Sequence, residues 1–136
     1  MSNLMAVKRP TPSLDPSASP VQVSDGTLSD LTSIFKLLSD KSRLRIVLAL
    51  SQNGKMHVSA LCQMLGQTQP AVSHHLTLMR IVGLVNYDRA GKHNFYYLAS
   101  DFVQQLIERF FREAGNGTPR LDFDEFSLNY ARRPEA

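Results

Sequence analysis

A mainly α-helical fold that carries one β-hairpin is predicted by three features of this chain of 136 residues. Apolar side chains recur at three- and four-residue spacing along several segments, as on the buried face of amphipathic helices. Two runs rich in Val, Tyr and Phe, at 84–88 and 93–98, flank Arg89-Ala90-Gly91-Lys92 and indicate a hairpin. Directly before the hairpin, a short helix, a turn containing Gly and a second helix are typical of a helix-turn-helix. We therefore expect a winged helix-turn-helix fold of the α+β class, in a dimer.

The composition allows one domain with tails and argues against a secreted or membrane protein. Basic residues outnumber acidic ones by 15 to 12, which permits a nucleic-acid partner without requiring one. Cys62 is the single cysteine, so no intramolecular disulfide can form. The first residues are followed by prolines rather than by the apolar run of a signal peptide, and no stretch approaches the roughly 20 apolar residues of a membrane span. We expect a cytoplasmic protein with no membrane partner.

Three helices are expected before the helix that follows the turn. The first begins near Thr27; Asp40 can cap the second, which ends near Asn53-Gly54, because an Asp side chain accepts a bond from a first-turn N–H. Ser59 is expected to cap the short third helix, and Gly66 to end it. The apolar residues of these helices are Leu31, Ile34, Phe35 and Leu38, then Leu44, Ile46, Val47, Leu48 and Leu50, then Leu61, Cys62 and Leu65.

A fourth helix is expected within QTQPAVSHHLTLMRIVGLV. Thr68 can cap it, Pro70 falls in its first turn, and Gly83 ends it. At about 100° per residue, one side is apolar and consists of Val72, Leu76 and Met79. The other side has short hydrogen-bonding groups, a cation near its end and no carboxylate, which suits a recognition helix in the major groove of double-stranded DNA. The predicted DNA-binding residues of this helix are Gln69, Pro70, Ser73, His74, Thr77 and Arg80.

The hairpin after this helix has its cations at the expected turn. Arg89 and Lys92 lie there, with His93 beside them. Turns are commonly polar for other reasons. A hairpin that directly follows a recognition helix can nevertheless bring these side chains to the sugar-phosphate backbone. We therefore predict that all three residues of this wing contact DNA.

The last helix, capped by Ser100 or Asp101, has a broad apolar side with two large aromatic residues. In a monomer this side could pack over the first helix, but self-association explains so much apolar area better. The residues of this predicted dimer surface are Phe102, Leu106, Ile107 and Phe110.

The chain is expected to have three parts. Residues 1–25 are rich in Ser and Pro and lack periodicity, which predicts a disordered N-terminal arm whose Lys8 and Arg9 are solvated rather than bound to phosphates. Residues 26–114 form the domain for DNA binding and dimerisation. The C-terminal tail, residues 115–136, is too apolar for a free tail, so we expect it to dock on the body.

Three segments, LSDKSRLRIVLAL, VSALCQMLGQTQPAVSHHLTLMRIVGLV and DRAGKHNFYYLAS, resemble the ArsR/SmtB family of bacterial winged-helix repressors. The resemblance runs from about Leu28 to Phe111. It implies a homodimer joined through the first and last helices, which adds Leu31 and Phe35 to the predicted interface. It also implies an operator of two inverted half-sites near a promoter, and repression by excluding polymerase.

The resemblance also assigns roles to single residues. The positions that match Gln69, Ser73 and His74 face bases in that family. His75 lies beside the apolar side of its helix by its angle, so we interpret it as a packed core histidine.

Metal sensing is the family's best-known activity, and here the sequence departs from the pattern. A Cys-x-Cys pair forms the third-helix site, but the aligned positions hold His57 and Ser59, and Cys62 falls on the buried stripe. In the last-helix site, Phe102 occupies the position of the first His. We therefore predict no metal site and no cofactor, and the effector is unassigned.

The sequence suggests two alternative functions. An enzyme would need His74, His75, His93 or Cys62 as metal ligands or as a nucleophile–base pair, but no carboxylate lies at a ligand-like spacing to the histidines. We predict no enzymatic activity. The stronger alternative is a winged-helix module that binds a protein partner through its apolar C-terminal tail. Binding that weakens steeply with added salt would favour DNA over such a partner.

Overall fold

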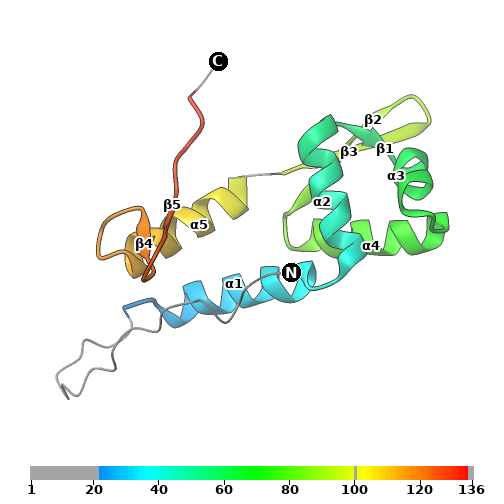
Figure 1. Ribbon diagram of the computed structural model, residues 1–136. Helices are drawn as coiled ribbons and strands as arrows, with labels where there is room; N and C mark the ends of the chain where they lie inside the picture. The colour runs from blue at the N-terminus through cyan, green and yellow to red at the C-terminus, as the bar shows by residue number, and fades with distance from the viewer. Residues whose placement is uncertain (1–21, 100, 135–136) are drawn as a thin grey trace. The chain divides into compact units, whose positions relative to one another are not determined.

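The computed structural model describes residues 22–99 and 101–134, so the predicted arm lies outside the described part except for its last residues. Within those ranges no helix is both long and apolar enough to cross a membrane. Residues 25–106 form one compact unit, and residues 107–134 belong to a second. The elements in chain order, labelled in Figure 1, are α1 (Asp25–Leu38), α2 (Lys41–Asn53), β1 (Met56–His57), α3 (Val58–Leu65), α4 (Gln69–Ile81), β2 (Val85–Ala90), β3 (His93–Leu98), α5 (Asp101–Ala114), β4 (Arg120–Asp122) and β5 (Ser127–Asn129).

Most of the predicted helix ends are confirmed. Asp40 Oδ1 accepts from the backbone N–H of Arg43 at 3.1 Å and caps α2, and Thr68 caps α4 with Pro70 in the first turn. Gly66, with a φ of 64°, ends α3 in the left-handed conformation that glycine adopts without strain. The end of α4 differs slightly, because its C-cap is Val82.

The predicted cap of α3 is wrong. The helix begins at Val58, one residue before Ser59, so the cap position falls on His57. His57 has an extended backbone, and its Nδ1 accepts from the Ser59 N–H at 3.1 Å. An imidazole nitrogen thereby does what a hydroxyl oxygen usually does at this position.

The core of the first unit lies among α2, α3, α4 and the strands. Its most deeply buried large residues, each exposed by 1% or less, include Ile46, Leu61, Val72, Leu76, Met79 and Val85, which confirms the predicted apolar side of α4. On α2, Leu44 and Leu48 are exposed, contrary to expectation. At 100° per residue they lie opposite Ile46 and Leu50, so the apolar run was wider than the face that packs.

A three-stranded antiparallel sheet in the order β1-β3-β2 holds the wing. The predicted hairpin is confirmed, but its strands are longer, because Arg89 and Ala90 pair with Asn94 and His93. Only Gly91 and Lys92 form the turn, and Gly91 has a φ of 63°. Figure 1 shows this hairpin extending beyond the helices of its unit.

Strand β1 was not predicted, because two residues are too short to show a periodicity. It pairs with β3 so that Met56 lies opposite Tyr96 and His57 opposite Phe95. The pairing brings the start of α3 beside the middle of β3.

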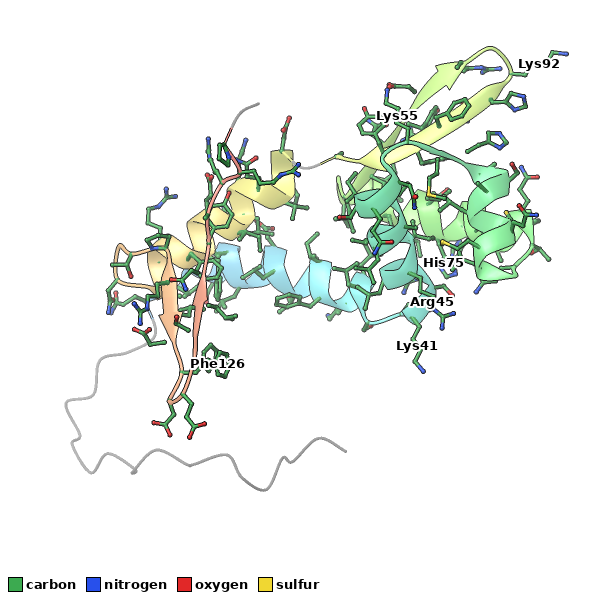
Figure 2. The ribbon with its side chains drawn as sticks, turned by 45° about the horizontal axis from the view of Figure 1, so that its top comes forward. Lys41, Arg45, Lys55, His75, Lys92 and Phe126 are labelled. Atoms are coloured by element: carbon green, nitrogen blue, oxygen red, sulfur yellow. The ribbon has the colours of Figure 1, made fainter. Side chains whose placement is uncertain are left out.

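The tail forms a second hairpin, β4–β5, which the sequence did not predict. Tyr130 donates from its hydroxyl to Glu108 Oε1 at 2.9 Å, and its ring stacks on Phe111 with centroids 6.1 Å apart. The tail therefore contacts the later part of α5. At the connection of the hairpin, Phe123 and Phe126 stack with centroids 4.5 Å apart, and both remain exposed. Phe126 is labelled in Figure 2.

Candidate nucleic-acid interface

Helix α4 presents the predicted contact residues on its open side. Gln69, Pro70, His74, Thr77 and Arg80 are exposed and Ser73 is half-buried, whereas the residues of the opposite side, Val72, Leu76 and Met79, are at most 1% exposed. The open side has no carboxylate. A helix held firmly along one side and polar along the other can enter the major groove without losing its packing.

The start of α2 holds α4 in place. Arg43 donates from Nε to the Leu37 carbonyl at 2.6 Å, and its Nη1 lies 3.3 Å from Nδ1 of His75. Close by in the fold, Gln67 Nε2 donates to Ser42 Oγ at 2.6 Å, which ties the turn before α4 to α2. His75 is therefore half-buried and hydrogen-bonded rather than a fully buried core residue (Figure 2).

The three cations at the start of α2 have different surroundings. Arg43 is engaged as described, whereas Lys41 and Arg45 are exposed, and Figure 2 shows them projecting from α2. The Asp40 carboxylate, which caps the helix, lies close to Arg43. The hydrogen bond that it accepts from the backbone N–H of Arg43 lowers the pKa of Asp40, and the nearby positive charge of Arg43 lowers it further.

Arg80 connects the end of the recognition helix to the wing. Its guanidinium lies over the ring of Tyr87 in β2, 4.6 Å from the centroid, and Tyr87 in turn contacts Tyr96 of β3 with centroids 5.3 Å apart. Arg80 remains exposed. A guanidinium stacked in this way has fewer orientations to lose when it meets a phosphate or a guanine.

The wing exposes all three predicted contacts. Lys92 lies at the turn, where Figure 2 shows its side chain extending from the tip. Arg89 donates from Nε to the Gly91 carbonyl at 3.3 Å, which holds it beside the turn.

Lys55 forms an ion pair with Asp88 of β2. Both partners are largely exposed, so this pair adds little to stability.

A pair of histidines, which sequence reasoning missed, lies between the wing and α3. Nδ1 of His93 is 3.1 Å from Nε2 of His57, and the two rings meet edge to face. The strand register explains the contact, because His57 lies opposite Phe95 and residues two apart on a strand share a face. The contact could have been predicted only together with the pairing of β1 and β3.

The histidine pair borders a pocket of about 290 Å³ between the wing and α4. The pocket is lined by His57, Val58, Ser59, Gln69, Ser73, Lys92, His93, Asn94 and Tyr96, a set without a carboxylate. Two predicted base-contacting residues and two predicted wing contacts thus share one concave surface.

The described residues do not assemble a recognisable metal site. Over 22–99 and 101–134, no group of three or more His, Cys, Asp or Glu side chains is placed to hold an ion. Cys62 is partly buried against the core. The histidine pair supplies two imidazoles, whereas a structural or sensing site for a transition metal uses three or four ligands.

The predicted dimer residues fall into three groups. Phe35 and Phe102 are 62% and 43% exposed, whereas Leu31 and Leu106 are 4% and 2% exposed and already buried within the chain. Ile107 and Phe110 are half-buried. Leu28, one of the exposed apolar residues of α1, was not predicted as part of the surface although its seven-residue spacing from Phe35 places it on the same side of the helix.

The short helix, turn, exposed polar helix and β-hairpin of the first unit define a winged helix-turn-helix DNA-binding protein. The comparisons give the family. Residues 40–87 match the family described as bacterial regulatory protein, arsR family. The chain belongs to the ArsR family of transcriptional regulators. The matched segment covers α2, the helix-turn-helix of α3 and α4, and the first half of β2.

Individual proteins that resemble this chain are also described as transcriptional regulators or DNA-binding domains. The uncharacterized HTH-type transcriptional regulator MJ1325 of Methanocaldococcus jannaschii is 39% identical over 75 residues, 55% of this chain and 84% of the relative. The arsenical resistance operon repressor of Escherichia coli K12 is 46% identical over 66 residues, 48% of this chain and 56% of the relative. The homodimeric winged helix-turn-helix DNA-binding domain of Mb0332 from Mycobacterium bovis superposes with a TM-score of 0.52 at 29% identity, covering 61% of this chain and 79% of that one. The protein-interaction alternative has no support among them.

Proposed function

We propose that this regulator is a homodimeric repressor that binds an inverted-repeat operator with α4 in the major groove. The observation that carries the proposal is the division of α4 into a buried apolar side and an open polar side without a carboxylate. The E. coli relative is a repressor by its name, and the M. bovis domain is homodimeric. Both properties are proposed here for this chain.

In this proposal the exposed side of α4 supplies the base contacts. Gln69, Ser73 and His74 lie along the first two turns, where a recognition helix reaches base edges. Thr77 donates to the Ser73 carbonyl at 2.9 Å, so its hydroxyl is oriented and its methyl group can face a thymine methyl. Arg80 lies farther along and can reach a guanine or a phosphate.

The wing supplies contacts to the backbone. Arg89 and Lys92 place two cations near the two-residue turn, and each cation that neutralises a phosphate releases counterions and strengthens binding at low salt. Phosphate contacts set the register of the protein on the duplex, and base contacts supply the sequence preference.

A dimer is needed because one recognition helix covers too few base pairs to select a site. The exposed apolar residues Leu28 and Phe35 on α1, with Phe102 at the start of α5, supply the surface for a second copy. Two copies related by a dyad place their recognition helices about 34–36 Å apart, one turn of the duplex.

The test is selection of genomic fragments by the purified protein, followed by footprinting of the selected sites at physiological salt. We expect protection of two inverted half-sites whose centres are one helical turn apart. A protein that bound all duplexes equally, or that left a single unpaired half-site protected, would contradict the proposal. Transcription from a promoter that contains the selected site, with and without the protein, then tests repression.

A further inference from the structure

The cap of α3 determines which nitrogens of two histidines carry protons. The backbone N–H of Ser59 can only donate, so Nδ1 of His57, 3.1 Å away, must accept. A neutral imidazole that accepts at Nδ1 carries its hydrogen at Nε2. His57 Nε2 therefore donates across 3.1 Å to Nδ1 of His93, and His93 in turn carries its hydrogen at its own Nε2.

The chain of hydrogen bonds thus has one direction. It begins at the backbone of α3, passes through His57 and leaves an N–H donor on the exposed ring of His93. The bond between the rings also fixes the position of that donor relative to the helix-turn-helix, because His57 belongs to β1 and caps α3. A neighbouring hydroxyl, Ser59 Oγ, lies 2.6 Å from Nδ1 of His57 and can donate to it as well.

The surroundings of this donor suit an anion. The residues that line the pocket bordered by His93 include Lys92, Gln69, Ser73 and Asn94, and none of the lining residues is an Asp or Glu. It opens between the base-contacting side of α4 and the wing, where the backbone of a bound duplex passes if α4 lies in the major groove. The phosphate groups of a bound duplex would therefore place an anion at this pocket.

We propose that His93 donates from Nε2 to one backbone phosphate of the operator, and that His57 is a positioning residue that holds His93 in the required tautomer and orientation. The inference rests on the proposed function, because it needs α4 in the major groove. It assigns His57, which makes no predicted DNA contact, a role in affinity.

A neutral donor has a signature that separates it from the cations of the wing. His93 strengthens binding through a hydrogen bond to a charged group, but it neutralises no phosphate and releases no counterion. Loss of His93 therefore lowers affinity at every salt concentration and leaves the slope of log K against log salt unchanged. Loss of Lys92 reduces the magnitude of that slope by about 0.9.

The experiment is a double-mutant cycle on the full chain, with operator binding measured by fluorescence anisotropy at pH 8 over a salt series. We expect His57→Ala and His93→Ala each to weaken binding about tenfold, the scale of one hydrogen bond to a charged group. The double variant should bind no more weakly than His93→Ala, because His57 acts through His93. Lys92→Ala is the matched control, and it alone should change the salt slope.

Loss of the α3 cap has to be separated from loss of positioning. His57→Asn keeps a side chain that caps helices well but is too short to reach His93. It should therefore unfold at the temperature of the wild type and bind DNA as weakly as His57→Ala. Long-range ¹H–¹⁵N spectra give a second measure: His93 should have its hydrogen on Nε2 in the wild type, and this preference should weaken in His57→Asn. Wild-type affinity in His57→Asn would overturn the positioning role.

Replacing single operator phosphates by neutral methylphosphonates identifies the partner. We expect one position at which the replacement weakens the wild type but not His93→Ala. The inference would be overturned by additive effects of the two histidine substitutions or by a salt slope that His93→Ala changes. It would also be overturned if every methylphosphonate that weakens the wild type weakened His93→Ala as well. Failure of the proposed function looks different, because wild-type protein would then show no preference for the selected site over a scrambled duplex.

Discussion

Nη1 of Arg43 lies 3.3 Å from Nδ1 of His75, which joins the beginning of α2 to the middle of the recognition helix. A guanidinium has no acceptor, so His75 must accept at Nδ1. The adjacent residue, His74, is exposed on the side of α4 that is proposed to face DNA. Two neighbouring histidines on one helix thus have separate roles, one in holding the helix and one in contacting bases.

We predict that His75→Ala and His74→Ala affect different properties. His75→Ala removes a partly buried partner of a charged group and should lower the free energy of unfolding by about 1–3 kcal/mol, while its ranking of operator variants stays that of the wild type. His74→Ala should relax base preference and leave stability within about 0.5 kcal/mol. Urea unfolding and binding to a panel of single-base operator variants measure the two effects. A reversed pattern would exchange the two assignments.

The wing is predicted to contribute charge rather than sequence preference. Arg89→Ala combined with Lys92→Ala should weaken binding to all duplexes alike and reduce the magnitude of the salt slope by about one unit for each lost phosphate contact. Lys36→Ala, which removes an exposed cation of α1, is the control for general charge. An unchanged salt slope in the double variant would show that the hairpin does not touch DNA.

Dimerisation is predicted to depend on Phe35, which is 62% exposed. A large apolar side chain buried at an interface contributes roughly 1.5–3 kcal/mol, so Phe35→Glu should weaken the dimer by at least about tenfold. Leu48→Glu makes the same change of charge at an apolar residue of α2 that is 53% exposed and should leave the dimer intact. Sedimentation equilibrium over a concentration series decides between the outcomes, and equal behaviour of the two variants would remove α1 from the interface.

The cap of α2 is predicted to make stability depend on acid. In the folded chain the pKa of Asp40 lies below its ordinary value of 3.8, chiefly because the carboxylate accepts a hydrogen bond from the backbone N–H of Arg43. The folded state therefore binds a proton at this carboxylate less readily than the unfolded state does. The stabilisation is fully present above the unfolded pKa and is lost as pH falls through the folded pKa. Asp40→Asn can still cap but does not titrate. Urea unfolding should therefore show that the variant loses less stability than the wild type between pH 5 and pH 3. This range brackets the ordinary Asp pKa of about 3.9. Identical pH profiles would mean that the Asp40 carboxylate does not contribute.

Local chemistry made much of this structure predictable from sequence. The Asp40 and Thr68 caps, the turn at Gly66 and the two sides of α4 each depend on residues within a few positions of one another, so spacing and side-chain type are sufficient. The exposed residues of α4 and the wing followed from the same patterns. The width of the packed face of α2 did not, because both Leu44 and Ile46 are apolar and only a neighbouring element decides which of them is covered.

The tertiary structure decided the contacts between residues that are far apart in the chain. Arg43 and His75 are 32 residues apart, and His57 and His93 are 36 apart. Each pair forms only because helices and strands pack in a particular arrangement, and a hydrogen bond between side chains is too short-ranged to be foreseen without it. The sequence alone therefore determined the fold class and the proposed DNA-binding side of α4, whereas packing determined the hydrogen bonds that hold this side and the wing in position.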